Sequence, residues 1–532
     1  MDLKQYVDYE GNYHLDDEYT YNEYEFYNDD DQDASVISNH KQLLPEMINF
    51  RLSHHNIADE LQFLCVNCIG VTLWQSIEHI AFTLCVCFAL RMILLVMQTF
   101  FLKHVKIIAG FHVVVILSGI AVLRNTFTDA FSTMLLVLSS LLLFVYLLNW
   151  FCACKQLNGG LIAALGTVVF IILGEIYFSD PLVWNKLRGV LLLVSMKLIS
   201  LSFDMFSCQI KDTYCNIFEF FSYCLHPGFL VYGPWISVKD YRNYIYSKRL
   251  LSIDWLFCII KNIFLSFLCL VLSVCILPYL FIDPVQPQNP SIFPIKGSKW
   301  LMSYCTAISF HFSHYYISYL AVVTSTLSGV GGVVQKKLKT EDDVESSSNV
   351  SWSEFKVTRP ISVEIPRSML NVVVAWNIPM SKWLKIYVFD KSRVLGDFPA
   401  VIFTYVASAM LHGLSLHLAA VLISLAFYTY TEHKLRLKLS NIFNCPEIQA
   451  RPPKTENNNF RGQRPLSPWA RLFNYVWVII NLMHLAYLGS MFHSSNESSE
   501  GYSITYTISE WRNLNFFSHW FALACFVVSL LI

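Results

Sequence analysis

Charged side chains are scarce in this sequence. Of its 532 residues, 14% are Asp, Glu, Lys or Arg, against about 25% in soluble domains, while 55% are hydrophobic. The formal net charge of −1 creates no general field that would attract nucleic acid. Apolar runs of roughly 18 residues or more recur along most of the chain after residue 78. These features exclude a secreted or cytosolic enzyme and predict a polytopic, all-α membrane protein.

The N-terminus lacks the basic start and apolar core of a cleaved signal peptide. Residues 1 to about 34 are instead rich in Tyr, Asp and Glu, and Lys4 is their only Lys or Arg. Such a composition predicts disorder. We therefore expect residues 1–70 to form a largely disordered cytosolic region and residues 71–532 to form the transmembrane domain, with membrane insertion starting at an internal helix.

Hydropathy predicts about eleven or twelve transmembrane or re-entrant helices. The expected spans are residues 80–102, 105–123, 131–151, 160–178, 187–203, 214–236, 255–282 and 299–325, a hairpin at 398–432, and spans at 470–492 and 515–532. Basic residues cluster near 239–249, 336–339 and 434–464, so the loops 337–370 and 434–468 should face the cytosol. The same alternation places residues 493–513 on the luminal side, where Asn496 begins a glycosylation sequon.

The 15 cysteines form no evident disulfide or zinc pattern. Most lie inside apolar runs, as Cys275 does, where a thiol behaves as a small hydrophobic group. The close pairs Cys65/Cys68 and Cys152/Cys154 lack a second pair at zinc spacing. We expect neither a disulfide framework nor a metal site.

Several ionisable residues fall within the predicted spans. A charged side chain costs roughly 2.5 to 3.5 kcal/mol at the centre of a bilayer, so such residues should face the protein interior or a water-filled cavity. Arg91, Glu175, Lys197 and Asp204 are of this kind. We expect the last three to pair with one another or with Arg188 and so to fix helix packing.

A helix-start signal occurs at Asn377, with Pro379 in the first turn. The helix that follows, to about Phe389, is short and carries Lys382 and Lys385, so it should lie along or dip into the cytosolic side. Two roles remain open for Asn377. It is an N-cap, typically worth about 1 kcal/mol, or its amide donates a hydrogen bond to a reacting carbonyl oxygen.

Two apolar helices should meet near His412. From Phe398 at the cytosolic face, the 14 steps to His412 rise about 21 Å, inside a hydrocarbon core of about 30 Å. Ser408 one turn before and Ser415 one turn after should share its face and hold its tautomer. The imidazole either specifies helix packing or acts as a base in a polar cavity. We read His417 as structural.

His311 and His314 lie one turn apart. A metal pair is conceivable, but the neighbouring sequence offers no carboxylate or cysteine, so cavity lining is preferred. The chain has no serine nucleophile elbow, glycine-rich phosphate loop or kinase signature. This favours a buried base that activates an incoming hydroxyl group beside an already activated acyl donor.

Several motifs carry a family resemblance. They are Trp184-Asn185-Lys186-Leu187-Arg188-Gly189, Gly233-Pro234-Trp235-Ile236-Ser237, Ser309-Phe310-His311-Phe312-Ser313, Arg359-Pro360 with Glu364-Ile365-Pro366-Arg367-Ser368-Met369, Trp376-Asn377-Ile378-Pro379-Met380-Ser381, and Ser408-Ala409-Met410-Leu411-His412-Gly413. With these motifs, from about residue 160 to the C-terminus, the chain resembles the membrane-bound O-acyltransferases. Within that family it is similar to the enzymes that acylate Wnt proteins.

The resemblance implies an all-helical fold with a central cavity open to both sides of the endoplasmic reticulum membrane. It implies transfer of a palmitoleoyl group from palmitoleoyl-coenzyme A to a serine hydroxyl of Wnt proteins, with no further cofactor. His412 would be the catalytic base and Asn377 its companion. The expected substrate-binding residues are Trp376, Ser408, Ser381, Ser415, His311, Arg367, Lys382 and Lys385.

Other interpretations remain open at this point. Arg359, Arg367, Lys382 and Lys385 could meet coenzyme A phosphates, or they could be positive-inside flanking charges. Another acyltransferase with a peptide or lysophospholipid acceptor would share His412 and Asn377. A non-enzymatic chaperone or transporter would also explain buried charges and a broken helical hairpin.

Overall fold

The fold is almost entirely helical. A computed structural model describes residues 57–100, 105–155, 157–178, 180–206, 216–246, 251–281, 299–330, 333–334, 350–352, 355–412, 415–451, 467–492 and 504–532. Within these ranges the one sheet pairs strand β1 (Val333–Val334) with strand β2 (Val350–Ser351) in antiparallel register. The predicted all-α class is confirmed. The acidic residues 1–56 and the sequon Asn496 lie outside the described residues.

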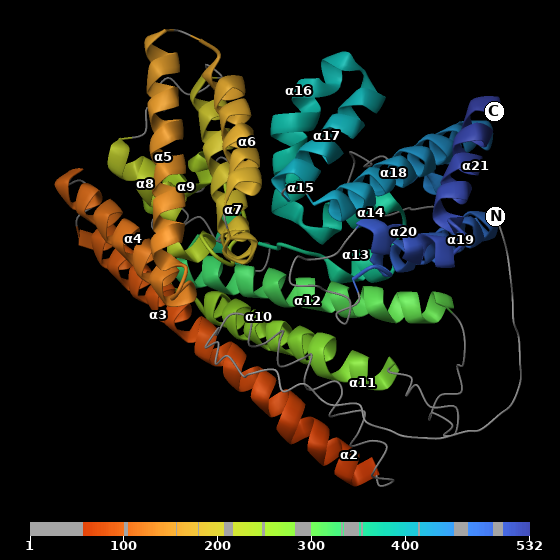
Figure 1. The fold of residues 1–532 in the computed structure, drawn as a ribbon, viewed down its shortest axis with the longest axis horizontal. Helices are drawn as coiled ribbons and strands as arrows, with labels where there is room; N and C mark the ends of the chain where they lie inside the picture. The colour runs from red at the N-terminus through yellow and green to blue at the C-terminus, as the bar shows by residue number, and fades with distance from the viewer. Residues whose placement is uncertain are drawn as a thin grey trace, which may run out of the picture.

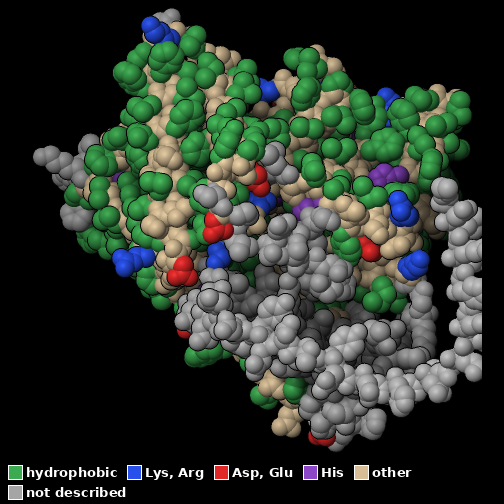
Figure 2. All heavy atoms as spheres, in the orientation of Figure 1, with side chains coloured by type: hydrophobic (Ala, Val, Ile, Leu, Met, Phe, Trp, Pro, Cys, Tyr) green, Lys and Arg blue, Asp and Glu red, His purple; other side chains and the backbone are tan. Residues whose placement is uncertain are grey.

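Membrane-length helices make up much of the chain. They are the continuous run α2 (Ile57–Phe63), η1 (Leu64–Gly70) and α3 (Val71–Phe100), then α4 (Val105–Thr126), α5 (Phe131–Cys154), α6 (Gly159–Tyr177), α7 (Pro181–Phe206), the run α10 (Ile253–Val271), η3 (Leu272–Ile276) and α11 (Leu277–Phe281), and α19 (Pro468–Gly489). Seven helices of the described ranges are long and apolar enough to cross a membrane, or up to eight if α20 (Ile504–Asn513) and α21 (Phe517–Leu531), bent by 75°, form one span. Figure 2 shows hydrophobic side chains over much of the upper part of one face, as lipid contact requires.

The C-terminal half holds two long helices, α12 and α18, and a series of shorter ones. These are α12 (Lys299–Ser328), α13 (Pro360–Glu364), α14 (Met369–Trp376), α15 (Ile378–Leu384), η4 (Lys385–Phe389), α16 (Asp390–Ser392), η5 (Arg393–Leu395), α17 (Asp397–Leu411), α18 (Leu416–Ile442) and η6 (Pro446–Ile448). In Figure 1, α15, α16 and α17 stand as one group opposite α5, α6 and α7, and α12 crosses below both groups. The helices α15, η4 and α16 pack along α17. The predicted hairpin is confirmed as α17 and α18.

One predicted span is wrong. The expected span 214–236 is instead the nine-residue helix α8 (Ile217–Leu225), the turn η2 (Pro227–Phe229) and a non-helical stretch before α9 (Val238–Tyr246). Nine residues rise only about 14 Å, too little for a bilayer, because Pro227 and Pro234 interrupt the helix. Among the described residues, the first helix begins at Ile57.

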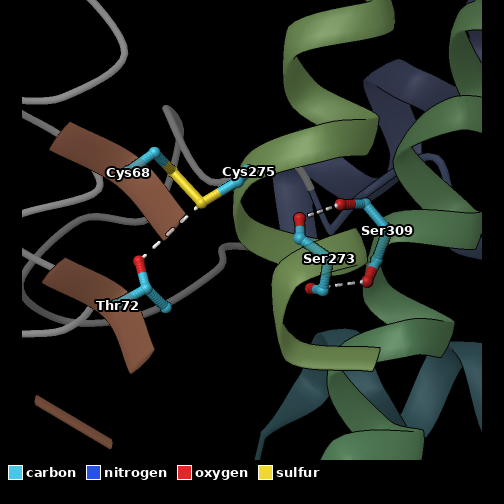
Figure 3. Close-up of a disulfide and its surroundings, with 5 residues drawn as sticks. All are labelled: Cys68, Thr72, Ser273, Cys275 and Ser309. Carbon is cyan, nitrogen blue, oxygen red and sulfur yellow. Dashed lines mark hydrogen bonds between the residues drawn. A yellow bond between two sulfur atoms is a disulfide. The ribbon is translucent and has the colours of Figure 1, made fainter. Parts of the chain in front are cut away.

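Close contacts hold the central helices together. Ser273 of η3 donates to the Ser309 carbonyl (2.9 Å), and Ser309 of α12 donates to the Ser273 carbonyl (2.8 Å), as Figure 3 shows. Where α19 meets α12, a Cβ on Gly489 would lie 2.4 Å from the Cβ of Ala307. Small residues and interhelical hydrogen bonds are the usual means of helix association in membranes.

A disulfide bond joins Cys68 of η1 to Cys275 of η3, residues that are 207 positions apart (Figure 3). Both cysteines are buried in π-helical turns. The expectation that Cys275 behaves only as a small hydrophobic group is therefore wrong. The sequence did not predict this pairing, because two cysteines on helices far apart in the chain have no characteristic spacing.

Removing this disulfide should destabilise the protein. Cys68→Ala leaves a 207-residue separation unlinked, and loss of a disulfide typically costs about 2–4 kcal/mol. Cys65→Ala, which removes an exposed free cysteine three residues away, serves as the control and should change little. Thermal unfolding in detergent measures both. Maleimide labelling of Cys68 and Cys275 that does not depend on prior reduction would contradict the disulfide.

The intramembrane charges face the interior, as expected, but pair differently. Glu175 lies 3.9 Å from Arg188 as predicted. Lys197 instead donates to the Cys224 carbonyl (3.0 Å) and lies 4.5 Å from the centre of the Phe229 ring, a cation–π contact. Asp204 accepts a hydrogen bond from Tyr387 (3.0 Å). The predicted pairing of Lys197 with Asp204 is wrong because each finds a partner on another helix.

Gly329 ends α12 beside the fully buried Arg91. Its φ of +92° lies in the left-handed region, and a Cβ there would come within 2.5 Å of the Arg91 guanidinium. Only glycine meets both conditions without strain. The C-terminal end of α12 therefore depends on Gly329.

Candidate active site

A helix break at Asn377 separates α14 from α15. Asn377 has the extended backbone of an N-cap (φ −141°, ψ 95°), and its Oδ1 accepts a hydrogen bond from Met380 N (3.0 Å). Pro379 occupies the first turn, where its missing N–H costs nothing. The predicted cap is confirmed. It uses only Oδ1, so the Nδ2 group is the atom that would serve a carbonyl oxygen.

The break is clamped by the chain just before α13. Ile378 N donates to the Val357 carbonyl (2.8 Å), and Arg359 N donates to the Ala375 carbonyl (2.9 Å). The hydroxyl of Thr358 donates to the same Ala375 carbonyl (3.0 Å). Groups that a helix break leaves without intrahelical partners are thus satisfied by residues 357–359. Asn377 is held in place from both sides.

Trp376 fastens the break to α12. Its ring stacks on His314 with centroids 4.1 Å apart and planes 6° apart, and His314 Nε2 donates to the Trp376 carbonyl (2.9 Å). The Phe310 ring also stacks on the Trp376 ring, with centroids 6.0 Å apart. The Ser309–Ser313 motif and the Trp376–Ser381 motif, which are far apart in sequence, therefore meet.

His311 belongs to a small polar group beside this stack. Its Nδ1 lies 3.0 Å from Glu364 Oε1, and the hydroxyl of Tyr315 donates to the same oxygen (2.6 Å). His311 is 4% exposed. The sequence prediction missed the partner Glu364, which lies in the Glu364–Met369 motif and comes near only through the packing of α13. The described residues contain no cluster that could hold a metal ion.

His412 stands at the end of α17. Its backbone N donates to the carbonyls of Ser408 (3.2 Å) and Ala409 (3.0 Å), and its own carbonyl accepts from Arg188 Nη1 (3.3 Å). The residue is half-buried, and Ser408, one turn earlier, is buried. His412 thus lies between α17 and α18, at the predicted break in the hairpin.

Helix α7 supports both candidate catalytic residues. Trp383 of α15 donates its indole N–H to the Met196 carbonyl (2.9 Å). Leu411, next to His412, shares one core cluster with Met196 and Trp383, and Met380 packs against this cluster. The helix capped by Asn377 and the helix that ends just before His412 thus share one hydrophobic cluster with α7.

The predicted neighbours Ser381 and Ser415 lie in different parts of the site. Ser381 lies on α15, where its backbone N donates to the Asn377 carbonyl (2.9 Å). Ser415 was expected to share the face of His412, and this is wrong because α17 ends at Leu411 and Ser415 precedes a separate helix. The hydroxyl of Ser415 lies 2.6 Å from His417 Nδ1 instead.

The basic candidates are not equivalent. Lys382 is exposed, and Lys385 pairs with Asp390 (2.9 Å) at an exposed site. Arg359 is also exposed. Arg367 donates to the Glu447 carbonyl (2.5 Å) and so ties α14 to η6.

A buried ion pair holds the start of α14. Arg436, fully buried, lies 2.8 Å from Glu432, and its guanidinium donates to the carbonyls of Arg367 (2.7 Å) and Ile448 (2.7 Å). The other oxygen of Glu432 accepts from Met369 N (2.8 Å). This network connects α18 to the first residue of the helix that leads to Asn377.

The pattern of the membrane-bound O-acyltransferase family matches residues 124–450 of this chain, which include every residue of the site described above. The chain belongs to this family. The matched residues include α7, the helix break at Asn377, and His412 between α17 and α18. An all-helical O-acyltransferase explains the broken hairpin and buried charges, so the alternatives of a transporter or chaperone are set aside.

Named relatives narrow the comparison. The chain is 34% identical over 484 residues to protein-serine O-palmitoleoyltransferase porcupine of Homo sapiens, covering 88% of this chain and 96% of the relative. It is 29% identical over 374 residues to the protein of the same name from Drosophila melanogaster, with 66% and 65% coverage. The chain is 22% identical over 292 residues to lysophospholipid acyltransferase 2 of Arabidopsis thaliana, with 49% and 60% coverage.

The two roles open for Asn377 can be separated by substitution. Asn377→Ser keeps an N-cap oxygen but removes the amide donor, whereas Asn377→Ala removes both. If this membrane-bound O-acyltransferase uses the amide, Asn377→Ser should lower the turnover rate about 10- to 100-fold with little change in thermal stability. Asn377→Ala should in addition lose about 1 kcal/mol of stability. Wild-type turnover in Asn377→Ser would leave capping as the only role.

Proposed function

We propose that this membrane-bound O-acyltransferase is a protein-serine O-palmitoleoyltransferase that acts on Wnt proteins. The observation that carries the proposal is the 34% identity, over 88% of the chain, to a relative of that name. In agreement with it, the helix capped by Asn377 and the helix that precedes His412 share one hydrophobic cluster with α7. His412 is the proposed base and Asn377 the proposed donor to the carbonyl oxygen.

The reaction needs no covalent enzyme intermediate. His412 accepts the proton of the serine hydroxyl as the oxygen attacks the thioester carbonyl carbon of palmitoleoyl-coenzyme A. The carbon–sulfur bond breaks, and coenzyme A leaves as a thiolate that takes up a proton. One histidine acting as a general base is worth typically about 10²- to 10⁴-fold in rate. Asn377 Nδ2 would stabilise the charge that develops on the carbonyl oxygen.

The donor is proposed to enter from the cytosolic side. Lys382 is exposed on α15, one turn after the Asn377 break, and Arg359 is exposed beside the same break. Cations of this kind suit the phosphate oxygens of coenzyme A. The bilayer would hold the acyl chain, and Trp376, Ser408, Ser381 and His311 are proposed to lie near the substrates.

The endoplasmic reticulum is the proposed location of this multi-pass protein. Disulfides form in oxidising compartments, so the Cys68–Cys275 bond supports a luminal position for the start of α3 and the end of the α10–α11 run. Asn496 remains a proposed luminal glycosylation site.

The direct test incubates the purified protein with labelled palmitoleoyl-coenzyme A and a disulfide-bonded Wnt hairpin peptide. Label should appear on the peptide and should be lost when the acceptor serine is replaced by alanine. A parallel reaction offers a lysophospholipid, the substrate class named by the more distant plant relative. Transfer to the lipid and not to the peptide would reject the Wnt assignment and retain an acyltransferase.

A further inference from the structure

We propose that Arg188 of α7 is a positioning residue for His412 and holds its backbone in the reactive place. This inference rests on the proposed function, because it gives Arg188 a role only through the proposed base. The guanidinium reaches the carbonyl of His412 from a helix that lies 224 residues earlier in the chain (Arg188 Nη1 to His412 O, 3.3 Å).

The end of α17 needs such a partner. The last carbonyl groups of a helix have no intrahelical donors, and a positive charge at that end is favourable. The backbone N of His412 is already fixed by Ser408 and Ala409. Arg188 supplies the matching contact on the carbonyl side, so both backbone polar groups of His412 are held.

Arg188 is itself held by a series of contacts from α6. Its Nη2 lies 3.9 Å from Glu175 Oε1, and Glu175 Oε2 accepts the indole N–H of Trp184 (2.5 Å). Trp184 is 3% exposed and packs against Gly174, where a Cβ would lie 2.1 Å from the ring. The guanidinium is therefore not a freely moving surface group.

Small displacements of His412 should be costly. The imidazole must meet the serine hydroxyl at hydrogen-bond distance, and a displacement of about 1 Å can cost roughly 100-fold in rate. Helix α7 also binds the helices that follow Asn377, through hydrogen bonds from Trp383 of α15 and Tyr387 of η4. Arg188 thus fixes the position of His412, the proposed base, relative to the helix break at Asn377.

The test compares Arg188→Gln and Arg188→Lys in the palmitoleoyl transfer assay. Arg188→Gln should lower kcat about 10- to 100-fold while the KM values for acyl-coenzyme A and peptide stay within about twofold. Arg188→Lys keeps a donor and a charge but not the planar fork, so it should restore part of the rate. Arg188→Gln should cause no additional loss when it is combined with His412→Ala.

Arg242→Gln is the matched control. Arg242 pairs with Glu219 at 2.6 Å, and its side chain is 22% exposed, the same as that of Arg188. This variant should lower thermal stability and leave kcat unchanged. An equal loss of kcat in both variants would overturn the positioning role and leave a structural one.

Two other results would also overturn it. Wild-type kcat in Arg188→Gln would show that His412 needs no such contact. A raised KM for acyl-coenzyme A at unchanged kcat would make Arg188 a donor-binding residue. Full activity of His412→Ala would reject the proposed base itself, and this outcome is read from that variant independently of Arg188.

Discussion

Replacing His412 by alanine is expected to abolish the proposed palmitoleoyl transfer while the protein remains folded and inserted in the membrane. The variant removes the proposed base, so the rate should fall by at least about 10²- to 10⁴-fold. The fold should survive because the hydrogen bonds that hold this residue use its backbone N and carbonyl, which alanine retains. Single-turnover transfer with labelled palmitoleoyl-coenzyme A measures the loss.

A second buried histidine provides the control. His484 of α19 is 3% exposed and lies 2.9 Å from the hydroxyl of Ser518 on α21, outside the site. His484→Ala should reduce thermal stability but preserve the rate per folded molecule. His412→Gln, which fills more of the space, should be as inactive as His412→Ala. Transfer at the wild-type rate in purified His412→Ala would refute the assignment of the base.

Replacing Arg436 by methionine is expected to give the largest loss of stability among these variants. Removal of one partner from a buried ion pair costs about 3–5 kcal/mol, because the remaining charge stays buried without compensation. Here Glu432, 3% exposed, would lose Arg436, and the carbonyls of Arg367 and Ile448 would lose their donor. The free energy of unfolding in mixed micelles measures the effect.

An exposed pair with the same spacing provides the comparison. Arg393 and Asp397 are also four residues apart, but their side chains are 65% and 72% exposed. Arg393→Met should change stability by about 0–1 kcal/mol, as exposed pairs do. If Arg436→Met were no more destabilising than Arg393→Met, the buried network would not hold α14. Activity of Arg436→Met should fall as well, because Met369 starts the helix that leads to Asn377.

The membrane class and most spans could be predicted because they depend on local composition. A run of about 20 apolar residues needs only its own length and hydropathy to be recognised. The prediction failed at 214–236, where Pro227 and Pro234 outweigh hydropathy and produce short helices. The cap at Asn377 was also predictable, since an N-cap side chain bonds to a backbone N–H three residues later.

Composition, helix breaks and short motifs thus determined the class of this protein, its two candidate catalytic residues and its family. Tertiary structure alone decided the partners: Glu364 for His311, Arg188 for the His412 carbonyl, and Cys275 for Cys68. The physical reason is distance along the chain. Helical periodicity reveals which face of a helix is apolar, but the contacts of a buried polar atom depend on which other helix packs there and at what height.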